Sequence, residues 1–354
     1  MISNISCVKT YLKSRNIDSM IVLGESNIYF LSSLDCPGIL IITEDENVFL
    51  TYDQYVGYAK GIIKIADQIN VETLNDIQDI VKYFQNSNRI GIEAKYMSLA
   101  DYNLTSKILD AEMVDVSGII ENLREIKDEE QITIMKDISE ILVSIMKKVK
   151  GKLQKGISEY EIREYIKNSI RNYTLEALDI VVHFGKNTSS RIKSYTNYKL
   201  RENDIVTISI AARKRGYTSR IGRTFFKGDF LDTNSDVKKE YEELIKVHDL
   251  MLRTIKSGEI VGDISKDIVE ELKNTLWNTY YDVGSGIGID VMEDPILNTH
   301  SKKKFKENMT LLITPSVFLE NAYGIIIEDV IVLTAVNYIM LTKFPREIEE
   351  LTIK

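Results

Sequence analysis

The chain has 354 residues, which is long enough for two domains that each bury a core of their own. With 44% hydrophobic and 28% charged residues and only four prolines, the composition excludes a disordered or fibrous protein. A formal net charge of −8 supplies no basic field for a phosphate backbone, so we expect no nucleic acid partner.

Short apolar strands alternate with helical patterns over the first 120 residues, as in an α/β domain. The predicted strands are Met20–Leu23, Gly38–Thr43, Val48–Thr51 and Arg89–Glu93. A charged stretch at 123–130 then leads into a long amphipathic helix with periodic apolar residues from Ile132 to Val149. We therefore expect two domains, 1–122 and 123–354.

The second half combines helices with alternating strands. A helix is expected after Ser158, which forms a capping box with Glu161, and further helices over 237–255 and 264–277. Predicted antiparallel strands are Asp204–Ala212, Tyr217–Lys227, Met309–Leu319 and Tyr323–Leu333. This pattern predicts an antiparallel sheet covered by helices, an α+β arrangement.

Short motifs along almost the whole chain occur in a characteristic order. They are Asn27-Ile28-Tyr29-Phe30-Leu31, Arg89-Ile90-Gly91-Ile92-Glu93, Leu123-Arg124-x-Ile126-Lys127-x-x-x-Gln131, Gly185-x-Asn187, Gly216-Tyr217-x-Ser219-x-Ile221-x-Arg223-Thr224-Phe225, Gly284-x-Gly286-Ile287-Gly288 and Ile327-Glu328-Asp329. Together they resemble the creatinase and Xaa-Pro peptidase family, the "pita-bread" metallopeptidases that include prolidase and aminopeptidase P. The resemblance implies a creatinase-like N-terminal α/β domain followed by a pita-bread α+β domain.

The resemblance also implies hydrolysis of the bond before proline by two divalent ions such as manganese or cobalt. Family members hold these ions through Asp in Ile-Asp-x-Gly-Ala, Asp in Ser-Asp-Ile-Thr-Arg-Thr-Phe, His in Gly-His-Gly-Ile-Gly, Glu in Ile-Glu-Pro-Gly and Glu in Arg-Ile-Glu-Asp. The corresponding residues of this chain are, in that order, Ser209, Arg220, Ser285, Thr314 and Glu328. Two neighbouring divalent ions need carboxylate ligands that neutralise their charge, and four of the five ligands are lost. We therefore expect no metal cofactor and no catalytic residue.

The positions that the family uses for substrate are altered as well. Its two pocket histidines correspond to Ile192 and Met292, and its arginine before the last ligand corresponds to Ile326, so none of the three can transfer a proton. Arg223 is a fourth position of this vestigial substrate pocket. Of the three histidines, His183 is expected nearest the old cleft, and His248 and His300 are expected at the surface.

Three functions are compatible with these losses, and the first is favoured. The protein is an inactive pseudo-peptidase that binds a peptide or another protein in the old cleft, as a peptidase-like domain in a histone-chaperone subunit suggests. Alternatively it is an Xaa-Pro dipeptidase with an atypical metal site, built by Asp290, Glu293 and Asp294 converging on Glu328. The third alternative is a metal-independent hydrolase of the creatinase type, although creatinase itself relies on the histidine that is Ile192 here.

Further expectations concern assembly and location. Prolidase-like members usually pair, so we expect a homodimer. No signal sequence and no run of 18 apolar residues occurs, and Cys7 and Cys36 match no zinc motif, so we expect a cytoplasmic protein without membrane contact.

The replaced ligands predict an ion pair in place of the metals. Arg220 and Glu328 correspond to ligands of the same metal pair, so their side chains should meet and leave the site neutral. The alternative is that Arg220 turns to solvent and Glu328 pairs with Arg223 or with water.

Overall fold

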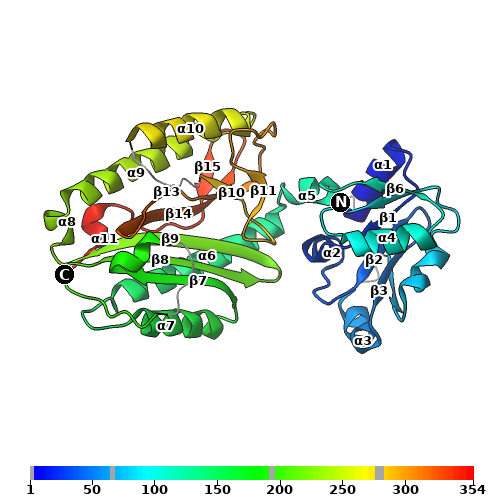
Figure 1. Cartoon of the computed structure of the whole chain (residues 1–354), viewed down its shortest axis with the longest axis horizontal. Helices are drawn as coiled ribbons and strands as arrows, with labels where there is room; N and C mark the ends of the chain where they lie inside the picture. The colour runs from blue at the N-terminus through cyan, green and yellow to red at the C-terminus, as the bar shows by residue number, and fades with distance from the viewer. Residues whose placement is uncertain (1–3, 64–67, 191–195, 276–282) are drawn as a thin grey trace. The chain divides into compact units, whose positions relative to one another are not determined.

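The computed structural model describes residues 4–63, 68–190, 196–275 and 283–354. The chain divides into two compact units, Met1–Arg124 and Glu125–Lys354 (Figure 1). The division follows Arg124, whereas the sequence placed the boundary after residue 122. None of the helices in these described ranges is long and apolar enough to cross a membrane.

The first unit is built on a six-stranded sheet in the order β4-β3-β2-β1-β5-β6. Its strands are β1 (Ser19–Val22), β2 (Ile39–Thr43), β3 (Asn47–Thr51), β4 (Ile69–Thr73), β5 (Arg89–Ile92) and β6 (Glu112–Asp115). Its helices are α1 (Asn4–Ser14), α2 (Glu25–Ser32), α3 (Asp53–Ile62), α4 (Leu99–Ile108), α5 (Ile119–Arg124) and the 3₁₀ helix η2 (Ile77–Tyr83). Strand β1 pairs parallel with β5 and antiparallel with β2. The sheet separates two apolar cores, because Met20 and Val22 of β1 face one and Ile21 faces the other.

The second unit contains a ten-stranded sheet with the main order β11-β10-β12-β14-β9-β8-β7. Its strands are β7 (Glu176–Phe184), β8 (Ile205–Lys214), β9 (Tyr217–Lys227), β10 (Gly284–Gly286), β11 (Glu293–Ile296), β12 (Thr310–Ile313), β13 (Ser316–Leu319), β14 (Tyr323–Leu333), β15 (Tyr338–Met340) and β16 (Thr352–Ile353). Its helices are α6 (Glu129–Lys150), α7 (Glu159–Asn172), η3 (Gly185–Ser189), α8 (Phe230–Thr233), α9 (Ser235–Thr254), α10 (Val261–Thr275) and α11 (Ile348–Leu351). Helix α6 packs against β8 and β9, α7 against β7, and α9 against β14.

Local sequence accounts for most of these elements. Helix α7 begins after the predicted capping box of Ser158 and Glu161. Strands β9 and β14 have the predicted bounds. The predicted strand Met309–Leu319 is wrong in one respect, because Thr314 and Pro315 divide it into β12 and β13. Proline has no N–H for a ladder bond, and Pro315 offers only its carbonyl, to Ile327 N at 3.2 Å. The expected helix end at Trp277 lies outside the described residues.

The register of the second sheet determines which side chains meet. One row across neighbouring strands contains Ser209 of β8, Gly222 of β9 and Glu328 of β14. The next row along contains Asp179 of β7, Ala211 of β8 and Arg220 of β9. Paired residues project from the same face of a sheet, and so do residues two apart on one strand. These side chains therefore share one face, which we call the site face.

Candidate functional site

Arg220 and Glu328 form the ion pair that the sequence predicted. Arg220 Nε lies 2.8 Å from Glu328 Oε2, and Arg220 Nη2 lies 3.3 Å from Oε1, so the guanidinium binds both carboxylate oxygens. Ser209 Oγ also donates a hydrogen bond to Oε2. The side chain of Glu328 is only 4% exposed and that of Arg220 is 18% exposed. Both oxygens of Glu328, the one carboxylate that the sequence aligned with the family's ligands, are thus bound.

A second carboxylate, Asp179, joins this pair and was not predicted from the sequence. Arg220 Nη1 donates to Asp179 Oδ2 at 3.2 Å. An irregularity in β7 between Ala177 and Asp179 places Asp179 opposite Ala211, on the site face; an uninterrupted ladder would have placed Leu178 there. One cation and two carboxylates leave these three groups with a formal charge of −1. The expected neutrality is therefore wrong for this cluster.

Two small residues make these contacts possible. Ala211 lies between Asp179 and Arg220 in their row, and Gly222 lies between Ser209 and Glu328 in theirs. A β-carbon added to Gly222 would lie 2.4 Å from Glu328 Oε2. The family motif quoted above has threonine at this position. The contact between Arg220 and Glu328 therefore depends on glycine at 222, because a side chain there would displace the carboxylate that Arg220 binds.

Electrostatics keeps Arg220 charged. Burial by itself lowers the pKa of the guanidinium, but the charges and hydrogen bonds of Glu328 and Asp179 outweigh it and raise the pKa above its usual value. A permanent cation therefore lies on the site face.

The other positions that the sequence aligned with metal ligands carry hydroxyl groups. Ser285 Oγ donates to the carbonyl of Gly286 at 2.9 Å. Thr314 directly follows Ile313, the partner of Asp329 in the ladder, and is 4% exposed. Within the described ranges its hydroxyl has no hydrogen-bond partner. The described residues also contain no group of three or more His, Cys, Asp or Glu side chains that could hold a metal ion. Hydroxyls and a guanidinium do not fit a pair of divalent ions, so the residues present do not match the family's metal centre.

The carboxylates of the alternative metal site have other partners. Glu293 Oε2 lies 3.2 Å from the ammonium of Lys127, and both side chains are buried. Glu293 Oε1 accepts a hydrogen bond from Asp290 N at 3.0 Å. Asp294 Oδ2 lies 3.2 Å from Lys303 Nζ. Within the described part of the chain, these residues form no metal-ligand cluster with Glu328.

The positions that the sequence aligned with the family's substrate pocket have different surroundings. Ile192 lies outside the described residues. Met292 is 63% exposed, whereas Ile326 is buried and its N–H donates to Thr224 Oγ1 at 2.8 Å. Arg223 lies on the face opposite the site face, because it follows Gly222 directly on β9. Ile326 lies two residues before Glu328 on β14 and therefore on the site face, so the structure does not gather the described positions into one pocket.

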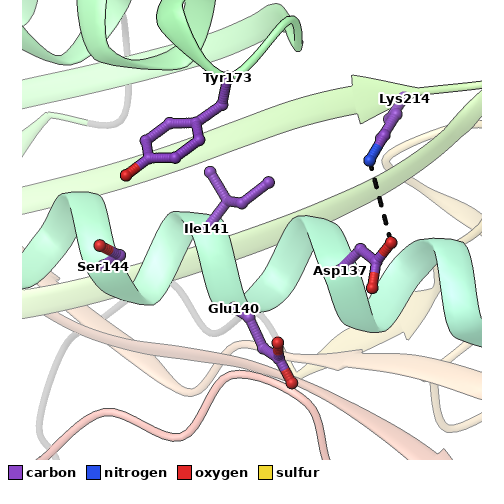
Figure 2. A pocket seen from close by; sticks show the side chains of 6 residues that line it. All are labelled: Asp137, Glu140, Ile141, Ser144, Tyr173 and Lys214. Atoms are coloured by element: carbon purple, nitrogen blue, oxygen red, sulfur yellow. Dashed lines mark ion pairs between the residues drawn. The ribbon is translucent and has the colours of Figure 1, made fainter.

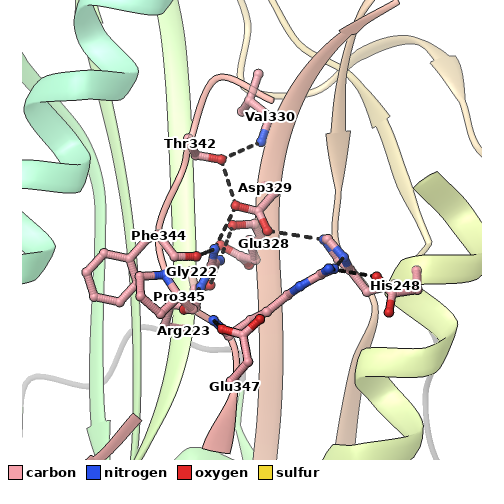
Figure 3. A network of polar contacts seen from close by, with 12 residues as sticks. Gly222, Arg223, His248, Glu328, Asp329, Val330, Thr342, Phe344, Pro345 and Glu347 are labelled. Atoms are coloured by element: carbon pink, nitrogen blue, oxygen red, sulfur yellow. Dashed lines mark hydrogen bonds and ion pairs between the residues drawn. The ribbon is translucent and has the colours of Figure 1, made fainter. Parts of the chain in front are cut away.

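Arg223 binds the neighbouring backbone and Asp329 rather than the Glu328 carboxylate (Figure 3). Its nitrogens donate to the carbonyls of Gly222, Glu328, Phe344 and Pro345 and to Asp329 Oδ1, at 2.7–2.9 Å. The predicted alternative, in which Arg223 pairs with the Glu328 carboxylate, is therefore wrong. Arg223 instead connects Phe344 and Pro345, near the C-terminus, to strands β9 and β14 through hydrogen bonds.

His248 belongs to the same network, and its predicted surface position is wrong. The residue is fully buried on α9, with Nε2 3.1 Å from Asp329 Oδ2 and Nδ1 in contact with Arg346 Nη1. A guanidinium only donates, so Nδ1 must accept and the proton lies on Nε2. The apolar stripe of α9 is compatible with either location, and no sequence pattern indicates that His248 meets the buried Asp329.

Burial sets the protonation states in this network. Burial lowers the pKa of His248 despite the opposing influence of Asp329, so the imidazole is neutral. Burial tends to raise the pKa of Asp329, but the charge of Arg223 and the contact with His248 hold it below its usual value. The remaining histidines differ from each other: His183 is buried on β7 opposite Thr207, and His300 is exposed.

A separate cavity of about 310 Å³ lies beside helix α6 (Figure 2). It is lined by Asp137, Glu140, Ile141, Ser144, Tyr173 and Lys214. Two of these lining residues form an ion pair, with Lys214 Nζ 3.9 Å from Asp137 Oδ2. None of the five positions that the sequence aligned with metal ligands lines this cavity.

Comparisons with known proteins agree with the architecture. The model of Metallopeptidase family M24 matches residues 133–335, and the Creatinase/Prolidase N-terminal domain matches residues 5–126. The Xaa-Pro dipeptidase of Pyrococcus furiosus is 22% identical over 346 residues, covering 96% of this chain and 97% of that protein. The solved Xaa-Pro dipeptidase from Bacillus anthracis gives a TM-score of 0.89 at 21% identity, covering 99% of both chains. The N-terminal domain of FACT complex subunit SPT16 from Cicer arietinum gives 0.79 at 16% identity, covering 99% of this chain and 98% of that one.

Proposed function

The chain belongs to metallopeptidase family M24, with a creatinase-type N-terminal domain and the pita-bread fold, and on this basis we propose that it is a pseudo-peptidase. It binds a peptide or a segment of another protein on the site face without metal and without hydrolysing it.

The contact between Arg220 and Glu328 carries this proposal. The remaining carboxylate of the old metal centre has both oxygens bound by a guanidinium and one bound by Ser209 as well. At an effective dielectric constant of about 20, two unit charges 4 Å apart interact by about 4 kcal/mol. A divalent ion beside Arg220 would meet a repulsion of about twice that size. The hydroxyls of Ser209, Ser285 and Thr314 are weak ligands that offer no compensating charge.

Binding without hydrolysis is supported by what the site face still presents. Arg220 is 18% and Asp179 24% exposed, so a ligand there meets both a cation and a carboxylate. Such groups can bind the carbonyl and amide groups of a peptide backbone. The same fold also occurs in the N-terminal domain of the FACT complex subunit SPT16.

One experiment tests metal binding, hydrolysis and ligand binding together. Purified protein is dialysed against manganese, cobalt or zinc, its metal content is measured, and proline release from Ala-Pro and Leu-Pro is followed. We expect substoichiometric metal and no proline, while the Pyrococcus furiosus Xaa-Pro dipeptidase releases proline in the same assay. Equilibrium dialysis with labelled Leu-Pro in EDTA then tests metal-free binding. Metal-dependent turnover, or no binding of Leu-Pro or of longer proline-containing peptides, contradicts the proposal.

Assembly and location form part of the same proposal. We expect a cytoplasmic homodimer without nucleic acid. Light scattering of the full chain should give twice the 40.6 kDa of one chain at micromolar concentration. A mass that stays at the single-chain value as concentration rises would contradict the dimer.

A further inference from the structure

The first unit contains a cavity of about 370 Å³ that the proposed function does not involve. It is lined by Ile92, Ala94, Met97, Leu99, Tyr102, Met113 and Asp115. Its volume is within the range of small-molecule sites, which are mostly apolar with a few polar groups that orient the ligand. Six of these residues provide apolar surface and one carries a charge, so the lining has that character.

The cavity lies at one edge of the sheet, at the ends of two strands. Strands β5 and β6 are parallel, and their last residues, Ile92 and Asp115, are neighbours in the ladder. Met113 lies two residues before Asp115 and therefore on the same face. Leu99 and Tyr102, three residues apart in the first turn of α4, line the other side. The site is thus a crevice at the carboxyl ends of parallel strands.

The apolar lining is accessible and adaptable. Leu99 is 75% exposed and Tyr102 is 39% exposed, although both are large apolar side chains. Met97 and Met113 are half-buried, and the flexible, polarisable methionine side chain adjusts to ligands of different shape. An apolar ligand of modest size would therefore gain contact area here without a large rearrangement.

The charge of the cavity selects the polar group of the ligand. Asp115 Oδ1 accepts bonds from Ser117 N at 2.9 Å and Ser117 Oγ at 2.6 Å, and these bonds lower the pKa of the carboxyl group. Within the described chain Oδ2 makes no hydrogen bond, and Asp115 is exposed. The N-terminus of α4 is already capped, because Ser98 Oγ accepts from Asp101 N at 3.0 Å. The nearby ammonium of Lys95 lies 5.3 Å from the centre of the Tyr96 ring.

We infer that this cavity binds a small amine, with an apolar body against Met97, Leu99 and Met113 and a primary ammonium group on Asp115. A ligand carboxylate would meet the like charge of Asp115 and no free cation among the lining residues. A neutral ligand would gain the apolar contacts alone. The inference concerns the first unit and is independent of the proposed function of the second.

Methionine methyl signals provide a direct test. The full chain is labelled with ¹³C-methyl methionine, and Met97 and Met113 are assigned with Met97→Leu and Met113→Leu variants. Phenethylamine, 2-phenylethanol and 3-phenylpropionate are then titrated separately. We expect phenethylamine to shift both signals and to bind about fivefold more tightly than the alcohol, as an exposed charge pair provides. The carboxylate should bind most weakly.

Asp115→Asn supplies the matched control. It should bind phenethylamine and 2-phenylethanol equally, while the signals of Met146 and Met251, buried in the second unit, stay in place and report an intact fold. Absence of any shift in the parent protein, or equal affinity of the parent for the amine and the alcohol, overturns the inference without any variant. Signals of Met97 and Met113 that change with protein concentration alone would show that a second copy covers the cavity, which also overturns it.

Discussion

Gly222 and Glu328 are paired on neighbouring strands, and the carboxylate of Glu328 fills the volume that a side chain at position 222 would need. A β-carbon on Gly222 would lie 2.4 Å from Oε2 and 2.6 Å from Cδ of Glu328. The carboxylate cannot move aside without losing its bonds to Ser209 and Arg220. The absence of a side chain at 222 is therefore a condition for the ion pair.

Gly222→Ala should accordingly destabilise the second unit. The added methyl group either displaces Glu328 from Arg220 or strains the strand, and overpacking of this kind costs about 1–3 kcal/mol. Urea unfolding followed by fluorescence and circular dichroism measures the loss. Gly151→Ala is the control, since a β-carbon there meets only the carbonyl of Lys148 at 3.6 Å. Equal stability of the two variants would show that Glu328 adjusts without cost.

Replacing Arg220 alone should lower the unfolding free energy more than replacing Arg220 and Glu328 together. Arg220→Ala leaves Glu328, whose side chain is 4% exposed, without its counter-charge, and stranding a buried charge costs about 3–5 kcal/mol. The partial exposure of Arg220 admits some water, so we expect the lower end of that range. In the double variant Arg220→Met/Glu328→Leu the buried carboxylate is removed as well, and only the 24% exposed Asp179 loses its cation, so the unfolding free energy should be closer to that of the parent. An Arg220→Ala variant that unfolds like the parent would show that the pair contributes little.

The sequence predicted the parts of this structure that depend on local pattern and motif order. Alternating apolar residues gave the bounds of β9 and β14, and the aligned motifs predicted the contact between Arg220 and Glu328. Asp179 could not be predicted in the same way. Its position on the site face depends on an irregularity in β7, and one extra residue in a strand reverses the face of every side chain after it.

The environment of His248 is a second feature that could not be predicted from the sequence. Its contacts come from Asp329 on β14 and Arg346 near the C-terminus, so they depend on tertiary packing. Histidine is intermediate between core and surface residue types, and its place in a predicted helix led to the wrong prediction of a surface position. Gly222 was likewise overlooked because its importance lies in the space it leaves for Glu328.

Restoring the family's ligand set should restore metal binding. The variant Ser209→Asp, Ser285→His, Thr314→Glu and Arg220→Asp would carry all five ligands together with the native Glu328. Its clustered carboxylates should make the metal-free variant less stable than the parent, and manganese should raise its melting temperature because only the folded state holds the ion. The parent should show no such shift. Adding Glu328→Gln should weaken the response, and a manganese shift of equal size in the parent would contradict the assignment of the lost ligands.

The stability of the protein should fall on acidification, and His248 should be responsible for part of the fall. The pKa of His248 lies below its ordinary value of 6.5 in the folded protein, so below pH 6.5 the unfolded chain takes up a proton that the folded chain excludes. Unfolding free energy then decreases as the pH falls, by up to about 1.4 kcal/mol per pH unit for this one group, until the pH reaches the folded pKa. Asp329 acts in the same direction at lower pH, because its pKa is also depressed in the folded state.

Urea unfolding between pH 7.5 and 5 measures this slope. His248→Asn removes the titrating group and offers Arg346 a side-chain oxygen in place of Nδ1, so the variant should have a shallower slope than the parent, whatever its stability at neutral pH. His300→Gln is the matched control, since His300 lies in an exposed loop and its replacement should leave the slope of the parent unchanged. If His248→Asn kept the full slope of the parent, the acid sensitivity would arise elsewhere. The imidazole would then take up its proton as readily in the folded chain as in the unfolded one, against its burial between Asp329 and Arg346.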